Sequence, residues 1–507
     1  MHDRVIVRRG AYYDSVTLML VSRNAGALEG AEAVAVGMAT PLNLELIESQ
    51  GFDLHGAGEL GPNDLLLAVR ARDDAAADGV VAAIDAELSA RSAGSGGAVE
   101  ERPPRSIVSA ARRHPELSVA FLSVPGHHVA YEAARALDAG LHVFCFSDGV
   151  SLEDEAALKR RALELGVLFM GADCGTAIID GVALGFANAV RRGPVGIVGA
   201  SGTGIQEVTC LLDAAGVGIS HAIGVGGRDL SAQVGGAMTR RGLELLGADA
   251  GTEAIVAISK PPDPEVADEI AVVAARAGKP VVLAFLGFGD PPATPPGVEY
   301  ATTLEAAAAR GAELLGHSLP DFEARLPRPP TRGCVRGLYS GGTLCKEAMS
   351  IVSGGVGRIA SNIPLQPDWL LADIRQTTGH AFIDFGEDEL TEGRPHPMID
   401  NTLRIEHLLQ DAADTQVTVI LLDVVLGYGA HPDPAADLGP AVSEAVAARE
   451  NLNVIVALCG TDGDPQGLER QRAALLEAGA AVTRSNAHAA RMALQAAAVK
   501  EASGVRS

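Results

Sequence analysis

Short apolar runs alternate with amphipathic stretches along most of the chain. From residue 117 onward, apolar runs such as SVAFLSVP (118–125), LHVFCFS (141–147) and VLFMGA (167–172) are separated by segments with helical periodicity. Strands that are apolar throughout are typical of parallel sheets covered by helices on both faces. The pattern therefore predicts an α/β architecture for this part of the chain.

Two further sets of apolar strands follow the first. The second begins after RRGP (191–194) with VGIVGA, SHAIGVG, EAIVAIS and PVVLAFLG. The third contains GLYS, FIDFG, VTVILLDVVLG, NVIVALCG and AAVTRS, with helices expected near 401–411, 437–450, 466–478 and 486–498. Ligands of open parallel sheets bind beyond the carboxyl ends of the strands. We therefore expect the functional residues in the loops that follow these strands.

The first 90 residues have a different pattern. Apolar strand-like segments alternate with helix-like ones in a βαββαβ-like order with an extra helix, which predicts a small α+β unit. Residues 92–105 read SAGSGGAVEERPPR, and this Gly/Ser-rich and then Pro/Arg-rich composition is typical of a linker. A second proline-rich break occurs at LPRPPTRG (326–333).

Composition excludes several classes of function. At 507 residues the chain is too long for one core, and its formal net charge of -24 argues against nucleic acid and anionic membranes as partners. The start, MHDRVIVRRG, lacks the apolar core of a signal peptide, so we expect a cytoplasmic protein. The six cysteines form no CxxC pair, and we interpret them as buried thiols.

Two short segments have nearly the same sequence. VGASGTGIQEV (198–208) and GLYSGGTLCKEA (337–348) both place Gly-Thr at the start of an expected helix, with a Glu four residues after the Thr. Helix N-termini carry unpaired N–H groups and a partial positive charge, and so bind phosphate or carboxylate. Each segment alone could be a capped turn, but the pair favours one shared anion site; neither has a Walker lysine. The candidate ligand-binding residues are Ser201, Gly202, Thr203, Ser340, Gly341, Gly342 and Thr343.

The densest polar run, TTGHAFIDFGEDELTEGRPHPMIDNTLR, spans 377–404. It gathers His380, Asp384, Glu387, Asp388, Arg394, His396 and Asp400 on or after an expected strand. We take His380, Arg394 and His396 as candidate catalytic residues that could bind a carboxylate or carry protons. A solvated loop with a helix cap at Asp400 is the alternative. The histidine spacing matches no metal-site template, so no metal site is predicted.

These segments also carry a family resemblance. The order SVAFLSVP, YEAARALDAGLHVFCFSDGV, GADCGTAII, VGIVGASGT, IGVGGRDL, GTEAIVAIS and KPVVLAFLG resembles the alpha subunit of succinyl-CoA synthetase over about 118–290. GLYSGGTLCKEAMSIV, FIDFGED and VTVILLDVVLGYG resemble the CoA-ligase domain of the beta subunit. As a whole, the chain resembles the FdrA family, a fused relative of both subunits.

The resemblance implies a specific domain order. It consists of a ferredoxin/ACT-like α+β domain (1–92), a CoA-binding-like Rossmann domain (106–192), and two flavodoxin-like domains with parallel sheets. The first of these is alpha-like (193–318) and the second is beta-like (335–500), and linkers are expected at 93–105 and 319–334.

The resemblance also assigns roles to the two small-residue segments, and several departures limit it. In the synthetases the two helices cradle a phosphorylated histidine, but the corresponding loop here, FGDPPATPPGVEY, contains no histidine. Lys260 stands where the synthetases carry a supporting glutamate, and we therefore add it to the candidate catalytic residues. The Gly-rich turn that grips CoA is replaced by RSIVSAARRHP, and the chain has no ATP-grasp segment. An emptied cradle with a lysine suits phosphate, an acyl phosphate or carbamoyl phosphate.

FdrA-type proteins are associated with purine (allantoin) catabolism. There they form one subunit of a multi-subunit carbamoyltransferase that converts oxalurate and phosphate to oxamate and carbamoyl phosphate. The resemblance thus implies a small anionic substrate, partner subunits and an oligomer. Two alternatives stay open: an acyl-CoA synthetase with CoA bound near 123–128 and 147–150, and a non-catalytic scaffold or regulatory subunit.

Overall fold

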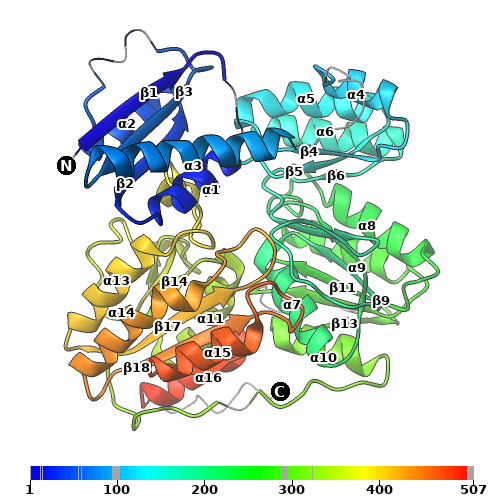
Figure 1. Cartoon of the computed structure of the whole chain (residues 1–507). Coiled ribbons are helices and arrows are strands. Elements are labelled where there is room, and N and C mark those ends of the chain that lie inside the picture. The colour runs from blue at the N-terminus through cyan, green and yellow to red at the C-terminus, as the bar shows by residue number, and fades with distance from the viewer. Residues whose placement is uncertain are drawn as a thin grey trace. The chain divides into compact units, whose positions relative to one another are not determined.

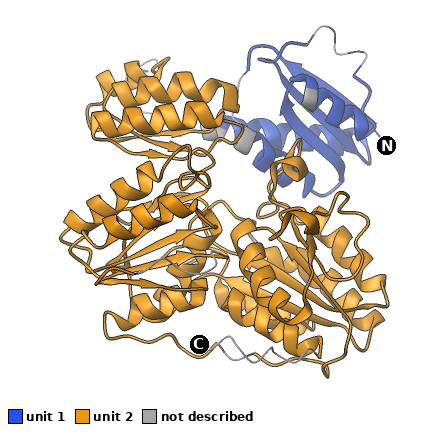
Figure 2. Ribbon diagram, turned by 180° about the vertical axis from the view of Figure 1, so that it is seen from behind, with its two compact units in different colours: residues 1–103 blue, residues 104–507 orange. Residues whose placement is uncertain are grey.

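The computed structural model divides the chain into two compact units, Met1–Pro103 and Pro104–Ser507 (Figure 2). It describes residues 2–11, 13, 15–54, 56, 58, 60–93, 103–287, 294–322 and 324–498. The linker predicted at 93–105 coincides with this division, although 94–102 lie outside the described residues.

The first unit is a three-stranded antiparallel sheet with three helices. Its elements are β1 (His2–Arg8), α1 (Ser15–Gly26), β2 (Ala31–Met38), α2 (Pro41–Ser49), β3 (Leu65–Ala71) and α3 (Asp74–Ala93). The strand order is β1-β3-β2. The central strand β3 is apolar along its length because its alternate side chains enter two cores, Leu65 and Leu67 on one face and Leu66 on the other. The α+β unit expected from the sequence is confirmed, but the expected βαββαβ-like order is wrong, because the described elements alternate as βαβαβα.

The second unit begins with a small parallel sheet, β4-β5-β6. Its strands are β4 (Val119–Leu122), β5 (His142–Cys145) and β6 (Phe169–Met170), and its helices are α4 (Ile107–Arg113), α5 (Gly126–Asp138) and α6 (Leu152–Leu165). The hydroxyl of Ser151 caps α6 by accepting from Asp154 N, and Gly166 ends the helix in the left-handed conformation.

The next layer is a seven-stranded sheet in the order β13-β12-β11-β9-β10-β7-β8. Its strands are β7 (Thr176–Ile179), β8 (Val182–Gly185), β9 (Arg192–Gly199), β10 (Ile219–Gly224), β11 (Ala254–Ser259), β12 (Val281–Phe285) and β13 (Val298–Tyr300). Its helices are α7 (Gly202–Ala214), α8 (Ala237–Ala248), α9 (Pro264–Ala274) and α10 (Leu304–Glu313). The sheet is parallel except for the edge hairpin β7–β8. Apolar runs did not predict this hairpin.

The last layer is a six-stranded parallel sheet in the order β15-β16-β14-β17-β18-β19. Its strands are β14 (Cys334–Tyr339), β15 (Ala360–Ser361), β16 (Ala381–Asp384), β17 (Val417–Val425), β18 (Asn453–Cys459) and β19 (Ala481–Thr483). Its helices are α11 (Gly342–Val356), η1 (Pro367–Trp369), α12 (Asp388–Thr391), α13 (Thr402–Ala413), α14 (Pro434–Ala448), α15 (Leu468–Glu477) and α16 (Asn486–Ala496).

The two large layers repeat one topology. Apart from their edge additions, the orders β10-β9-β11-β12-β13 and β16-β14-β17-β18-β19 both read 2-1-3-4-5 in chain order, the flavodoxin-like arrangement. The strand order reverses beside the first strand, so the loops after β9 and β14 lie at the ligand-binding edge. These loops are the two small-residue segments identified in the sequence.

Helices of the two layers pack against each other. Contacts join α7 with α11 and α10 with α16, which are all labelled in Figure 1. The apolar residues of all four helices belong to one buried core. Because α7 and α11 start at the two repeated loops, this packing places the N-termini of both helices together.

Candidate functional site

The two small-residue segments, which we call the first corner (198–208) and the second corner (337–348), meet in the structure. The hydroxyl of Ser201, at the start of α7, donates to Oγ1 of Thr343 in the first turn of α11 over 2.6 Å. Both side chains are buried. A Cβ at Gly341 would lie 2.7 Å from Cγ2 of Thr203, so this approach requires glycine. We expected the pair of corners to form one shared anion site, and the structure brings the two corners together.

The N-termini of α7 and α11 are capped differently. Ser201 caps α7 by accepting from Gly204 N at 2.9 Å. Helix α11 starts after Gly341, which has no side chain to serve as a cap. The first N–H groups of a helix have no intrahelical partner, and the end of α11 therefore offers more open donors than that of α7. The positive ends of both helix dipoles point into the same region.

A buried ion pair supports the second corner from behind. Asp423 in β17 accepts from Ser340 N at 2.7 Å, from the Ser340 hydroxyl at 3.0 Å and from Gly341 N at 2.9 Å. Arg404 in α13 donates to the same carboxylate at 2.9 Å. Both donors of Ser340 are thus used within the protein. The structure corrects our interpretation of Ser340 as a ligand-binding residue and gives it a structural role.

A lysine lies at the corner of α11, and a second lysine lies in the same helix. Lys260 follows β11 at the edge where the strand order of its layer reverses, and its Nζ lies 3.6 Å from the position of a Cβ at Gly342. Lys346 lies one turn into α11. Burial lowers the pKa of Lys346, and the nearby charge of Lys260 lowers it further. Lys260 thus places a positive charge at this corner, and its effect on Lys346 shows that the two cations interact.

Asp384, the last residue of β16, completes the corner. Its Oδ2 faces Gly342 beside Lys260, and its Oδ1 accepts from Gly386 N at 3.0 Å. Burial raises its pKa to about 7, the charge of Glu387 adds to the shift and that of Lys260 opposes it. A carboxyl with this pKa can both donate and accept a proton near neutral pH. Asp384 was noted in the polar run but was not among the candidate catalytic residues.

His396 lies on the other side of Asp384. A Cβ at Gly386 would lie 2.9 Å from His396 Nε2 and 3.2 Å from Asp384 Oδ1. Nδ1 accepts from Met398 N at 3.2 Å, so the hydrogen of the neutral ring is on Nε2. The residue is partly exposed, but its ring packs against Phe186, and burial lowers its pKa to about 4. At neutral pH His396 is thus an uncharged hydrogen-bond donor beside Asp384.

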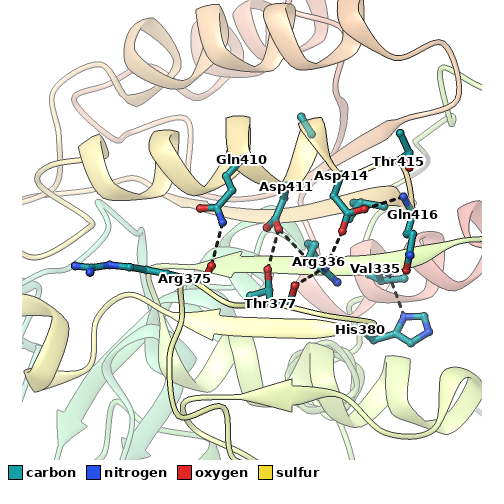
Figure 3. A network of polar contacts seen from close by, with 12 residues as sticks. Val335, Arg336, Arg375, Thr377, His380, Gln410, Asp411, Asp414, Thr415 and Gln416 are labelled. Atoms are coloured by element: carbon teal, nitrogen blue, oxygen red, sulfur yellow. Dashed lines mark hydrogen bonds and ion pairs between the residues drawn. The ribbon is translucent and has the colours of Figure 1, made fainter.

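The structure removes two sequence candidates from the site. His380 precedes β16 and lies at the opposite edge of the sheet, where its Nδ1 accepts from Val335 N at 3.1 Å (Figure 3). It borders a buried network in which Arg336 pairs with Asp411. Arg394 is exposed, and among the described residues nothing bonds its guanidinium. The role that we assigned to His380 is therefore replaced by a structural one, and Arg394 is not held toward the corners.

The N-terminus of α5, near one position proposed for CoA, is tightly packed. A Cβ at Gly126, the first residue of this helix, would collide with the backbone of Gly149. The loop at 148–149 therefore packs directly against the start of this helix. Among the described residues, no group of three or more His, Cys, Asp and Glu could hold a metal ion, and no helix is long and apolar enough to cross a membrane.

Three family models match separate parts of the chain. Residues 338–496 match the CoA-ligase family, residues 190–287 the CoA binding domain, and residues 1–104 the heavy metal-associated domain of AllF. The first two span the two corners and Lys260. Residues 1–104 contain no cysteine, and thiolates are the ligands that soft metal ions prefer. The N-terminal domain therefore does not fit a thiolate metal site.

Together the fold, the paired corners and these matches define a succinyl-CoA-synthetase-like protein. The chain is 41% identical to the uncharacterised protein YahF of Escherichia coli over 96% of its own length and 97% of that of YahF. It belongs to the same family, the FdrA-like proteins.

More distant relatives match only parts of the chain. The alpha subunit of the ADP-forming succinate–CoA ligase of Aquifex aeolicus is 29% identical over 38% of the chain and 64% of the ligase subunit. Among solved structures, the dinucleotide-forming acetyl-coenzyme A synthetase 1 of Ca. Korarchaeum cryptofilum matches at 18% identity and a TM-score of 0.33, over 75% of this chain and 82% of that one.

Proposed function

We propose that this protein is a subunit of a multi-subunit carbamoyltransferase of the oxamate type. It binds phosphate or carbamoyl phosphate between the N-termini of α7 and α11. The observation that carries the proposal is the 2.6 Å contact between Ser201 and Thr343, which joins two helix N-termini beside Lys260. Two neighbouring helix N-termini beside a lysine are suited to a dianion.

The site residues match the chemistry of phosphorolysis. A phosphate oxygen attacks the carbamoyl carbon of oxalurate, the carbon–nitrogen bond to oxamate breaks, and the proton of hydrogen phosphate ends on the nitrogen of oxamate. Lys260 and the helix ends orient the phosphate and balance its charge. Asp384, whose pKa is about 7, is suited to carry the proton between the two reactants.

Sequence features favour this reaction over thioester formation. The loop that would carry a phosphorylated histidine has none, and the match to an AllF-type N-terminal domain supports the link with allantoin catabolism. We expect further subunits, which would supply the binding sites for the rest of the substrate, within a hetero-oligomer.

Calorimetric titration with phosphate and with carbamoyl phosphate tests the proposal. We expect binding that Lys260→Met and a Ser201→Ala/Thr343→Val double variant each weaken by about tenfold or more, since each removes charge-assisted or hydroxyl contacts. Arg394→Gln serves as the control and should bind like the parent. Tight CoA binding without phosphate binding would contradict the proposal.

An acyl-CoA synthetase is the second candidate function, and the CoA-ligase and CoA binding domain matches favour it. Its signature is CoA binding by the isolated chain and thioester formation with an acid and a nucleotide. If variants at both corners leave the activity of the assembled complex unchanged, the third possibility, a scaffold or regulatory subunit, replaces both.

A further inference from the structure

Each corner helix carries one deeply buried glutamate at the same position. Glu207 is the sixth residue of α7, and Glu347 is the sixth residue of α11. Both point away from the anion site into the interface between the two large layers, where each is at most 2% exposed. The repeated Glu of the two sequence segments therefore has a function that the corners themselves do not explain.

The two glutamates make reciprocal contacts across the interface. Glu207 accepts from the backbone N of Asn486, the first residue of α16 in the last layer, at 2.8 Å. Glu347 accepts from the backbone N of Leu304, the first residue of α10 in the preceding layer, at 2.6 Å. Each corner helix thus supplies the acceptor for the final helix of the opposite layer.

The two final helices are otherwise capped within their own layers. Thr303 caps α10 by accepting from Ala306 N, and Ser485 caps α16 by accepting from His488 N. A helix has several unpaired N–H groups at its start. In both helices the local hydroxyl satisfies one of them, and the glutamate of the other layer satisfies another.

Further contacts connect the two glutamates to each other. Asn486 Nδ2 donates to Glu347 at 2.7 Å, so that Asn486 contacts both carboxyls. Glu305 lies beside them but is paired with Arg491, and the thiol of Cys459 adjoins Glu207. Burial raises the pKa of Glu207 to about 8 and that of Glu347 to about 7. Burial of two carboxyls this deep in an interface costs free energy unless well-placed hydrogen bonds compensate for the lost hydration.

We propose that Glu207 and Glu347 are positioning residues, which hold the two large layers in register so that the corners at Ser201 and Thr343 meet. Loss of either acceptor leaves a helix N–H unpaired in the interface, and the layers shift to solvate it. The consequence for anion binding rests on the proposed function, whereas the effect on the register of the corners does not.

A disulfide trap measures the register directly. In the S201C/T343C double variant the introduced thiols replace hydroxyls that are 2.6 Å apart, so mild oxidation with oxidised glutathione should join them. The cross-link is located by mass spectrometry of the full-length chain, and its rate of formation is compared between backgrounds. Absence of the cross-link in the otherwise unchanged protein would overturn the proposal, because the corners would then not meet.

Three backgrounds distinguish positioning from general stability. We expect Glu207→Leu or Glu347→Leu to slow cross-linking about tenfold, whereas Glu→Gln at the same positions keeps the acceptor and should stay within about twofold of the parent. If a Leu variant does not fold, the Glu→Asp variant at the same position, whose side chain is one methylene shorter, takes its place. This variant should also slow the cross-linking. Asp411→Asn, a buried carboxylate at the far edge of the last sheet, is the matched destabilising control.

Equal cross-linking rates in all of these backgrounds would overturn the proposal. Phosphate titration of the same Glu variants, without the introduced thiols, provides the second measurement. If the Leu variants slow the cross-link but no variant or parent binds phosphate, the proposed function fails and the positioning role stands.

Discussion

The two large layers share one topology, yet their corners are built differently. At the first corner the cap is the side chain of Ser201, which also reaches across to Thr343. At the second corner the cap position is Gly341, and a buried Asp423–Arg404 pair holds the backbone from behind. At the first corner the hydroxyl of Ser201 is used within the protein, whereas the second corner leaves the first N–H groups of α11 without a side-chain cap. The repeated fold thus contains two corners of different construction.

Removal of the support behind the second corner should have the largest effect. Arg404→Leu leaves the buried carboxylate of Asp423 without its cation, and breaking a buried pair in this way costs about 3–5 kcal/mol of unfolding free energy. Chemical denaturation monitored by circular dichroism measures the loss. Among the described residues no ion pair lies behind the first corner, so Ser201→Ala should cost only about 1 kcal/mol. Similar losses of unfolding free energy in the two variants would contradict this difference between the corners.

A methyl group at the second corner tests how closely the two halves approach. Gly341→Ala places a Cβ 2.7 Å from Cγ2 of Thr203, and overpacking of this kind costs about 1–3 kcal/mol. We expect both a lower stability and a weaker phosphate affinity, measured by denaturation and calorimetry. Adding Thr203→Ala removes two of the three atoms that this Cβ would meet, Cγ2 and Oγ1, and should restore part of both. If Gly341→Ala alone binds phosphate normally, the corners do not approach as described.

The smallest effect is a pH dependence that belongs to the second corner alone. Asp384 has a pKa of about 7, so it is neutral below that pH and negatively charged above it. A charged carboxylate repels a bound dianion, and anion affinity should therefore fall about three- to tenfold between pH 6 and 8. Sulfate is the suitable probe, because its charge is constant over this range. Asp384→Asn should make the affinity nearly independent of pH. If this variant leaves the pH profile unchanged, Asp384 is not the group whose titration changes the affinity.

The sequence predicted the layers and the pair of corners because both leave local patterns. Continuous apolar strands and the repeated Gly-Thr segments are readable without tertiary contacts. The hairpin at 176–185 was missed, although its turn, Asp180-Gly181, is a hairpin signal in which both residues have positive φ. Lys260 came only from the family resemblance.

The remaining site residues depend on how distant segments converge. Asp384, Lys346 and Asp423 gain their roles from burial beside α11, which no local pattern reports. The error at His380 was avoidable, because this residue precedes its strand and the ligand edge lies at the strand's other end. His396, which follows the same strand, lies on the correct side.

The reciprocal exchange between Glu207 and Glu347 has a consequence for assembly. Each final helix takes one of its N-terminal acceptors from the other layer, so neither layer alone completes the hydrogen bonds at that helix end. The connecting peptide, from the end of α10 to the start of β14, turns their association into an intramolecular reaction with a high effective concentration. The hydrogen bonds at the N-termini of α10 and α16 therefore form independently of the protein concentration.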